Sequence, residues 1–179
     1  MLEDGDGGLV ERCRNGDRRA FEVLVVRYQK PVFNAALRML RNPDDARDVA
    51  QTVFLKVYEH LADYDPNFKF YSWIYRIAVN ESINVLQRRR RHEPIAGDEV
   101  DGAIGPEGLV AGQQVGVGIQ KAIMKLKPDH QSVIVLRHFL DCSYQDMAEI
   151  LSLPEKTVKS RLFAARQQLA EALSKDGVA

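Results

Sequence analysis

Residues 143–169, SYQDMAEILSLPEKTVKSRLFAARQQL, contain the clearest structural signal in the sequence. Apolar residues recur in both halves of this stretch at the spacing of an α-helix: they are Met147, Ala148, Leu151, Val158 and Leu162. Ser152 and Leu153 leave only a tight connection between the halves, and Pro154 opens the second half. Two helices joined in this way are typical of a helix-turn-helix, and the small Ala148 lets them cross closely.

The second helix of this motif has a basic face beside its apolar stripe of Val158, Leu162 and Ala165. The side chains that avoid the stripe are Lys156, Lys159, Ser160, Phe163 and Arg166. A helix with one buried and one basic face fits the major groove of DNA, where Lys and Arg bond guanine or phosphate and Phe contacts a thymine methyl group. The alternative is the solvated face of an ordinary helical hairpin, and an exposed Phe163 argues against that alternative.

A second concentration of aromatic and basic residues lies between residues 64 and 91. The aromatic residues are Tyr64, Phe68, Phe70, Tyr71, Trp73 and Tyr75, and Lys69 lies among them. They precede four residues that share one helix face because they follow at intervals of four: Arg76, Asn80, Asn84 and Arg88. Aromatic rings stack on unpaired bases with ~1–3 kcal/mol per base, and Asn can bond a base edge. The alternative is that most of the rings are core, which we expect for Trp73 and Phe70.

The helix expected from about residue 44 to residue 61 has one large apolar side chain outside its apolar stripe. The stripe consists of Ala46, Val49, Ala50, Val53, Phe54, Val57, Tyr58 and Leu61. At about 100° per residue, Leu55 lies almost opposite that stripe. The polar residues that flank Leu55 are Asp48, Gln51, Thr52 and Glu59. A polar face with one large aliphatic side chain at its centre resembles a protein-docking surface. A single exposed Leu is also common on protein surfaces, so this face is weaker evidence than the helix-turn-helix.

Charge and glycine content divide the chain into three parts. Residues 1–92 have a net charge of +3 and residues 116–179 one of +2, whereas residues 93–115 contain five acids and no Lys or Arg. Glycines concentrate in the acidic part, which therefore can bury little apolar surface. We expect an all-α protein of two small helical domains, residues 1–92 and 118–179, joined by a flexible acidic linker at 93–117.

Cap and breaker residues predict where the other helices begin. Asp17 caps a helix through Tyr28, and Pro31 starts or kinks the segment that follows it. Asn42 and Pro43 open the helix that carries Leu55. The remaining expected helices are 73–91 with Ser72 as its cap, 118–126, a helix capped by Asp129 that reaches Leu140, and a last helix from Pro154 to Leu173.

The sequence contains no pattern typical of a membrane protein, a secreted protein, a metalloprotein or an enzyme. No apolar run approaches the ~18–20 residues of a membrane span, and the acidic N-terminus lacks the features of a secretory signal, so we expect a cytoplasmic protein without membrane insertion. Cys13 and Cys142 are too few for a disulfide framework, and His138 with Cys142 lacks further metal ligands, so we expect a core Cys and a surface His. The motifs of nucleotide-binding, metalloprotease and nucleophile sites are missing, so we expect no cofactor, no metal and no catalytic residue.

Together, these features resemble the extracytoplasmic-function (ECF, group 4) sigma factors of bacterial RNA polymerase. The resemblance rests on four stretches: DRRAFEVLVVRY (17–28), PDDARDVAQTVFLKVY (43–58), FYSWIYRIAVNESINVLQRRRR (70–91) and the helix-turn-helix of 143–169. It implies a promoter-specificity subunit rather than an enzyme. Residues 1–92 would correspond to sigma region 2 and residues 118–179 to sigma region 4, with the linker running toward the RNA exit path.

The resemblance also implies a role for each surface. Region 2 would bind the clamp helices of the polymerase core through Asp48, Gln51, Thr52 and Leu55. It would capture the unpaired −10 strand through Tyr64, Phe68, Lys69, Tyr71, Arg76, Asn80, Asn84 and Arg88. Region 4 would dock on the polymerase flap and read the −35 duplex through Lys156, Thr157, Lys159, Ser160, Arg161, Phe163 and Arg166. Sigma factors of this kind are often silenced by an anti-sigma factor that covers these surfaces.

Two residues depart from the family pattern, and two other functions stay open. Pro154 stands where a Ser-type cap is common, and Ala164 where a basic residue is frequent, which leaves the −35 preference open. One other function is that of a stand-alone regulator that binds duplex DNA. The aromatic loop argues against it, because a protein that binds only duplex DNA does not need rings that stack on unpaired bases. The other is a helical interaction protein without a DNA role, for which Phe163 on a basic helix has no explanation.

Overall fold

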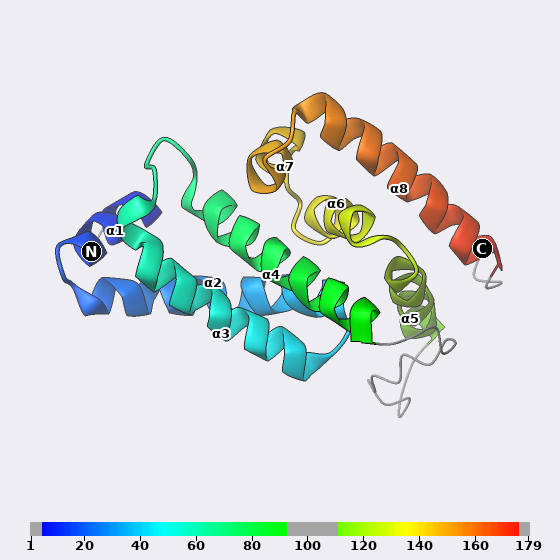
Figure 1. The fold of residues 1–179 in the computed structure, drawn as a ribbon, viewed down its shortest axis with the longest axis horizontal. Coiled ribbons are helices and arrows are strands. Elements are labelled where there is room, and N and C mark those ends of the chain that lie inside the picture. The colour runs from blue at the N-terminus through cyan, green and yellow to red at the C-terminus, as the bar shows by residue number, and fades with distance from the viewer. Residues whose placement is uncertain (1–4, 93–110, 176–179) are drawn as a thin grey trace.

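The computed structural model describes residues 5–92 and 111–175, and these residues form helices and no strand (Figure 1). The helices before the gap are α1 (Asp6–Arg14), α2 (Arg18–Leu40), α3 (Pro43–His60) and α4 (Phe70–His92), with a 3₁₀ turn η1 (Leu61–Asp63) after α3. The helices after the gap are α5 (Ala111–Met124), α6 (Pro128–His138), α7 (Tyr144–Leu151) and α8 (Glu155–Lys175). The prediction of an all-α protein is confirmed.

Helices α2, α3 and α4 pack against one another around the part of the core called here the first core, and α1 packs against α2. The buried residues of α5–α8 continue the same cluster. The residues at the centre of this core include Leu24, Met39, Val53 and Ile74. The predicted caps of α2 and α3 are confirmed. Asp17 Oδ1 accepts a hydrogen bond from the backbone N of Arg19 at 3.0 Å, and Asn42 Oδ1 accepts one from the backbone N of Asp44 at 2.9 Å.

We predicted that Pro31 starts or kinks a second segment. Helix α2 instead continues through Pro31 to Leu40, so the prediction of a separate segment was wrong. A proline inside a helix lacks the N–H for one backbone bond and costs about 3 kcal/mol. Val32, directly after it, and Ala36, one turn farther along, are buried in the first core. Burial of this stretch against α3 and α4 offsets the cost of the proline and keeps the helix continuous.

Two predicted caps are in different places. Helix α4 begins at Phe70, so Ser72 lies in its first turn, where the side chain is buried and Oγ has no hydrogen-bond partner among the described residues. Helix α6 begins at Pro128 and its N-cap Lys127 makes no side-chain cap bond, so Asp129 lies in the first turn. Both helices begin earlier than predicted because apolar burial, rather than a polar cap, decides where they start.

Two further elements differ from expectation. Helix α5 begins at Ala111, so residues 111–117 of the expected linker are helical, and residues 93–110 of that linker lie outside the described residues. Helix α1 was not predicted from the sequence, since its short glycine-containing segment has little apolar periodicity. Its Leu9 and Val10 are nevertheless buried in the first core.

The predicted helix-turn-helix is confirmed as α7 and α8, both of which pack against α6. Ser143 and Asp146 form a reciprocal capping box at the start of α7, with Ser143 Oγ accepting from the backbone N of Asp146 at 3.1 Å. Ser152 has a positive φ of 53°, which allows the tight turn between the two helices. The buried side chains between the helices are Met147, Ile150, Val158 and Leu162.

The helices on either side of the gap also pack against each other. Helix α7 contacts α4, and helices α5 and α6 contact α2. Figure 1 shows α6 and α7 lying beside α4, which faces the viewer. This packing brings the beginning of α4 to the first helix of the helix-turn-helix.

Candidate nucleic-acid interfaces and docking surface

The exposed side of α8 is the first candidate surface, called here the α8 face. It consists of Lys156, Lys159, Ser160, Phe163 and Arg166, all of which are exposed. Phe163 leaves 64% of its surface in solvent, whereas Val158 and Leu162 on the other side of α8 are buried. The predicted division of this helix into a buried stripe and a basic face with an exposed aromatic ring is therefore confirmed. Thr157 and Arg161, also predicted to contact DNA, are half-buried at the edge of this face.

Two cations of the α8 face, Lys159 and Arg166, have partners that fix their positions. Lys159 Nζ lies 2.5 Å from Glu155 Oε1 and 5.2 Å from the centre of the Tyr144 ring. The hydrogen bond and charge of Glu155 raise the pKa of Lys159, so this cation stays protonated. Arg166 Nε donates to His138 Nε2 at 3.3 Å. Burial, followed by the charges of Arg166 and Arg137, lowers the pKa of His138, which leaves the ring neutral and able to accept this bond.

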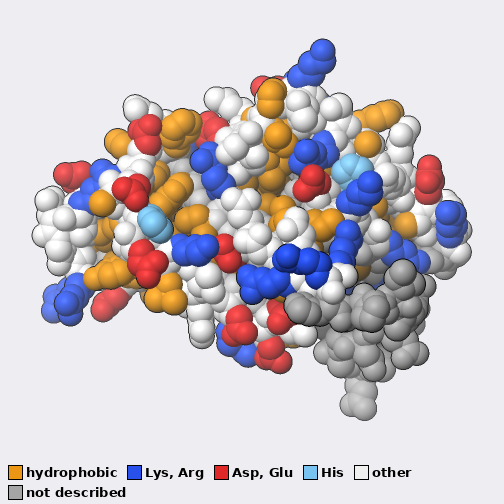
Figure 2. All heavy atoms as spheres, viewed as in Figure 1, with side chains coloured by type: hydrophobic (Ala, Val, Ile, Leu, Met, Phe, Trp, Pro, Cys, Tyr) orange, Lys and Arg blue, Asp and Glu red, His pale blue; other side chains and the backbone are white. Residues whose placement is uncertain are grey.

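The second candidate surface follows α4 and is called the α4 face. Its residues are Lys69, Tyr71, Arg76, Asn80, Asn84 and Arg88. Asn80, Asn84 and Arg88 are exposed and lie on successive turns. Lys69 lies directly before the helix, and Phe68 in the preceding loop leaves 48% of its surface exposed. Figure 2 shows Lys and Arg side chains gathered across the middle of the side of the molecule on which α4 lies.

Tyr64 does not belong to the α4 face, and its predicted role in stacking on an unpaired base was wrong. Only 5% of its surface is exposed. Its ring packs against Phe70 and Trp73, with ring centres 5.6 Å and 5.3 Å away, and its hydroxyl donates to the backbone oxygen of Phe68. Burial accordingly raises the pKa of the Tyr64 hydroxyl. The sequence could not separate this ring from Phe68, because both occur in a loop without helical periodicity.

Arg14 of α1 holds the start of the aromatic loop and was missed by the sequence analysis. Its guanidinium donates to the backbone oxygens of Leu61 and Ala62, each at 3.1 Å, and to that of Tyr64. These carbonyls belong to η1 and to the residue directly after it, and the Leu61 oxygen also accepts from the backbone N of Tyr64 at 3.4 Å. Arg14 therefore determines the direction in which the loop leaves α3 toward α4. A single Arg in a short helix carries no sequence signal for such a role.

The beginning of the α4 face is in contact with α7. Lys69 Nζ lies 2.9 Å from Asp146 Oδ1, and the Arg76 guanidinium donates to the backbone oxygen of Glu149. Burial by itself raises the pKa of Asp146, but hydrogen bonds from Tyr71, Ser143 and Lys69 outweigh burial and hold it well below the usual range of a carboxyl group. Asp146 is therefore ionised at neutral pH and forms a true ion pair with Lys69.

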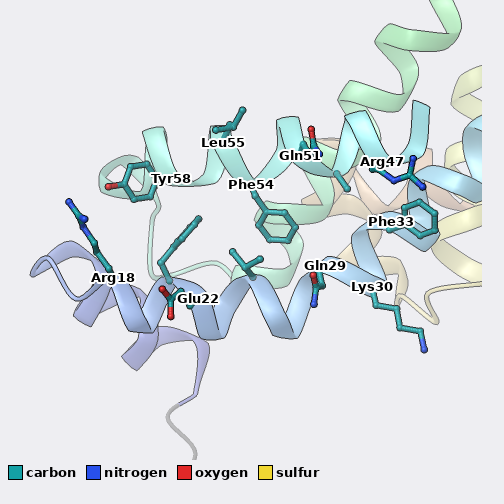
Figure 3. A pocket seen from close by; sticks show the side chains of 13 residues that line it. Arg18, Glu22, Gln29, Lys30, Phe33, Arg47, Gln51, Phe54, Leu55 and Tyr58 are labelled. Atoms are coloured by element: carbon teal, nitrogen blue, oxygen red, sulfur yellow. The ribbon is translucent and has the colours of Figure 1, made fainter. Parts of the chain in front are cut away.

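The third candidate surface, the α3 face, consists of Asp48, Gln51, Thr52 and Leu55. Leu55 leaves 63% of its surface exposed, as predicted from its position opposite the apolar stripe. Asp48 and Gln51 are exposed and Thr52 is half-buried. Gln51 and Leu55 also border a groove of about 1030 Å³ between α2 and α3, which the sequence did not predict (Figure 3).

Aromatic and aliphatic side chains from α2 and α3 line this groove: Phe21, Val25, Phe33, Phe54, Leu55 and Tyr58. Tyr58 was expected in the apolar stripe of α3, but 60% of its surface is exposed, so that prediction was wrong. Its ring meets the edge of Phe21 of α2 at 5.2 Å instead of entering the core. The residues at one edge of the α3 stripe, Phe54 and Tyr58, therefore line the groove.

The α3 face and the α4 face meet at a smaller hollow of about 440 Å³. Asp48 and Thr52 from α3 and Arg88 from α4 line it. Nearby, Arg89 pairs with Asp45, and Lys56 Nζ lies 2.6 Å from Glu81 Oε1. These pairs join α3 to α4 and place two of the predicted surfaces side by side.

The described residues contain no group of three or more His, Cys, Asp or Glu side chains that could hold a metal ion. Cys142 is buried, and burial followed by the charges of Asp146 and Asp141 raises its pKa to about 11, while His138 is exposed. Both placements agree with the prediction of a core Cys and a surface His. None of the described helices combines the length and apolar composition needed to cross a bilayer.

Comparison with known proteins identifies the family. The Sigma-70 region 2 family matches residues 24–92, and the Sigma-70 region 4 family matches residues 117–169. RNA polymerase sigma-H factor of Pseudomonas aeruginosa is 35% identical, with the match covering 97% of this chain and 96% of the relative. ECF RNA polymerase sigma factor SigW of Bacillus subtilis is 32% identical over 92% of this chain and 94% of the relative.

Solved structures agree with these sequence relationships. CnrH, solved in complex with the cytosolic domain of CnrY, superimposes with a TM-score of 0.74 and 26% identity over 97% of this chain and 99% of CnrH. The sigma factor RpoE of Bartonella quintana, solved with the anti-sigma factor NepR, shares the fold with a TM-score of 0.68 and 23% identity, over 86% of this chain and 96% of RpoE. The chain belongs to the sigma-70 family of RNA polymerase sigma factors, in its ECF group.

Proposed function

We propose that this ECF sigma factor directs bacterial RNA polymerase to promoters by reading two DNA elements with two separate surfaces. The observation that carries the proposal is the α8 face, where Phe163 is exposed among Lys156, Lys159 and Arg166. An exposed aromatic ring inside a basic patch is explained by a partner that offers both phosphates and apolar base groups. Duplex DNA in its major groove offers both.

Helix α8 acts as the recognition helix for the −35 element. Its first turns bring Lys156 and Lys159 to the groove, where they contact phosphates or guanine edges. Phe163 meets a thymine methyl group, and Arg166 lies one turn farther along for a second base or phosphate. The buried stripe holds α8 on α6 and α7, so the helix enters the groove as a rigid element. The same domain docks on the polymerase flap.

The α4 face captures the unpaired −10 strand. Asn80 and Asn84 offer a donor and an acceptor to base edges, and Arg88 follows the phosphate backbone. Phe68 in the preceding loop provides an exposed ring for stacking. Extracting a base from the duplex costs a few kcal/mol, and stacking of ~1–3 kcal/mol per base offsets that cost. Capture of the strand thereby stabilises the melted promoter.

The α3 face binds the clamp helices of the polymerase core. Leu55 is the apolar centre of this surface, and Asp48, Gln51 and Thr52 form its polar rim, which is the usual anatomy of a protein interface. The groove beside Leu55 extends the apolar area with rings from α2 and α3. A groove between two helices fits a helix of a partner, which supports the clamp helices as its occupant.

The chain acts by binding, and the polymerase supplies the chemistry, so the chain itself is not an enzyme and uses no cofactor. It works where the polymerase and the promoter meet, in the bacterial cytoplasm. CnrH and RpoE were each solved with a protein partner. We infer that this chain too has an anti-sigma factor, which silences it by covering the same surfaces.

Transcription by bacterial core polymerase on a randomised promoter library tests the proposal. With the sigma factor added, we expect start sites that share two sequence elements at a constant spacing, since two rigid surfaces on one chain read them. Core polymerase alone is the control. If folded protein adds no initiation, and instead binds duplex DNA strongly without polymerase, the chain is a stand-alone regulator and the proposal is wrong.

Substitution Phe163→Ala tests the −35 assignment. We expect weaker binding to the selected −35 duplex, by roughly the 1–3 kcal/mol of a mismatched base pair, and unchanged binding to unrelated duplex, because the lysine contacts to phosphate remain. Titration of labelled duplexes by the holoenzyme at fixed salt measures both. Glu171→Gln, an exposed position two turns farther along α8, serves as the control. An equal loss on both duplexes would show that Phe163 does not read bases.

Substitution Leu55→Asp tests the polymerase-docking surface. We expect affinity for core polymerase to fall at least tenfold, because burying one unpaired carboxylate at an interface costs more than ~1.4 kcal/mol. Helicity by circular dichroism should not change, since Leu55 lies outside the core. Val26→Asp, which alters an equally exposed apolar residue on α2, is the matched control. Unchanged polymerase affinity for Leu55→Asp contradicts the assignment.

Substitution Asn80→Ala tests capture of the −10 strand. The side chain is exposed, so its removal should leave the fold and polymerase binding nearly intact. We expect promoter-dependent transcription to fall more than polymerase affinity does, because the lost hydrogen bonds are made only to melted DNA. Run-off transcription and polymerase binding are measured on the same preparation. Equal losses in the two measurements would mean that Asn80 is a packing residue.

A further inference from the structure

We propose that α7 is an intramolecular competitor of the promoter strand, which in the free chain docks on the beginning of the α4 face and occupies Lys69 and Arg76. This inference rests on the proposed role of the α4 face in binding the −10 strand. It adds an interaction surface within the chain. It also means that the sigma factor binds the −10 strand more weakly while α7 is docked on α4 than after α7 has moved away.

The contact uses cations that were predicted to bind DNA. Lys69 Nζ meets Asp146 Oδ1 at 2.9 Å, and the Arg76 guanidinium donates to the backbone oxygen of Glu149. The Tyr71 hydroxyl hydrogen-bonds to the same Asp146 carboxylate. The two oxygen acceptors lie in the first and the last turn of α7 and so reach two successive positions along α4.

These acceptors imitate the phosphate oxygens of DNA. Asp146 presents a carboxylate, and Glu149 presents a carbonyl at the negative end of α7, where it also accepts a long bond from the backbone N of Ser152 at 3.4 Å. A Lys or Arg that contacts these oxygens cannot contact a phosphate with the same N–H groups. Binding of α7 and binding of the strand at Lys69 and Arg76 are therefore mutually exclusive.

Further contacts keep the second domain in this place. Arg38 of α2 lies over the ring of Phe139 at 4.4 Å, and its backbone oxygen accepts from Gln120 Nε2 at 2.6 Å. Arg90 near the end of α4 donates to the backbone oxygen of Leu126 at 3.2 Å. The interface therefore extends from the beginning of α4 to its end and does not depend on a single ion pair.

The interface also contains a defect that favours its opening. Arg76 Nε and Glu149 Oε2 are both buried without a hydrogen-bond partner in the described part of the chain. A buried polar group without a partner destabilises the closed arrangement, and more so when it is charged. Opening returns both groups to water. The closed arrangement is thus only moderately stable, and a partner with higher affinity for the open form can shift the equilibrium.

Closure affects the two DNA surfaces differently. Phe163 and Arg166 of the α8 face stay exposed in the closed chain. Asn80, Asn84 and Arg88 also remain exposed. We therefore expect closure to weaken binding of the −10 strand and to leave binding of the −35 duplex nearly unchanged.

Substitution Asp146→Asn tests the competition in the full-length chain without polymerase. The probe is a fluorescent pool of random-sequence single-stranded DNA, and small-angle X-ray scattering measures domain opening without DNA. We expect affinity for the strand to rise about fivefold or more, which is the lower end for coupled sites, and the radius of gyration to increase. Asn keeps the shape of the side chain but removes the charge that holds Lys69.

The matched control is Ser143→Ala, which removes the other half of the capping box but leaves the Asp146 carboxylate facing Lys69. It weakens the start of α7 but leaves the charge of Asp146 in place, so we expect little change in affinity for the strand. A rise in both variants would show that general loosening of α7, rather than the Asp146 contact, is responsible, and would overturn the proposal.

Two other results overturn the competition and distinguish it from the role of the α4 face. If wild type and Asp146→Asn bind the strand with equal affinity, the competition is wrong but the −10 assignment stands. The same holds if the wild-type chain is extended in solution. Absence of strand binding by every variant, with and without core polymerase, contradicts the −10 assignment itself and the competition with it.

Discussion

The carboxylate of Asp146 connects the two halves of this molecule. It accepts hydrogen bonds from the backbone N and the hydroxyl of Ser143, which starts α7, and it pairs with Lys69 at the beginning of α4. Hydrogen bonds outweigh burial and hold its pKa low, so the charge persists. Because α7 is both the support of α8 and the neighbour of α4, this one group links the two surfaces proposed to bind DNA.

Each proposed surface is the outer side of a helix whose inner side is buried. Leu55 stands opposite Val53 and Val57 on α3, and Phe163 stands opposite the buried Ala165 on α8. Burial of the inner stripe stabilises each helix in its place. The exposed side chains therefore keep a constant spacing without contacts of their own, which is what recognition of DNA or of a partner helix requires. The apolar groove between α2 and α3 borders one of these surfaces.

Sequence reasoning failed where a residue's neighbours in space are not its neighbours in the chain. Tyr64 and Phe68 occur in the same aromatic loop, but only packing on Phe70 and Trp73 buries the first and leaves the second exposed. Tyr58 has the spacing of a core residue, but α2 meets it with the edge of Phe21 and leaves it in solvent. The long helix through Pro31 persists because tertiary burial outweighs the local penalty.

Local pattern was sufficient for the all-α class, the helix-turn-helix, the caps at Asp17 and Asn42, and the exposure of Leu55 and Phe163. Helical periodicity depends on residues three or four apart, so the sequence contains that information directly. The tertiary structure alone decided the groove between α2 and α3, the hold of Arg14 on the aromatic loop, and the contact of α7 with α4. Lys69 and Asp146 are 77 residues apart, and no short-range pattern specifies which distant charges meet when two helices pack.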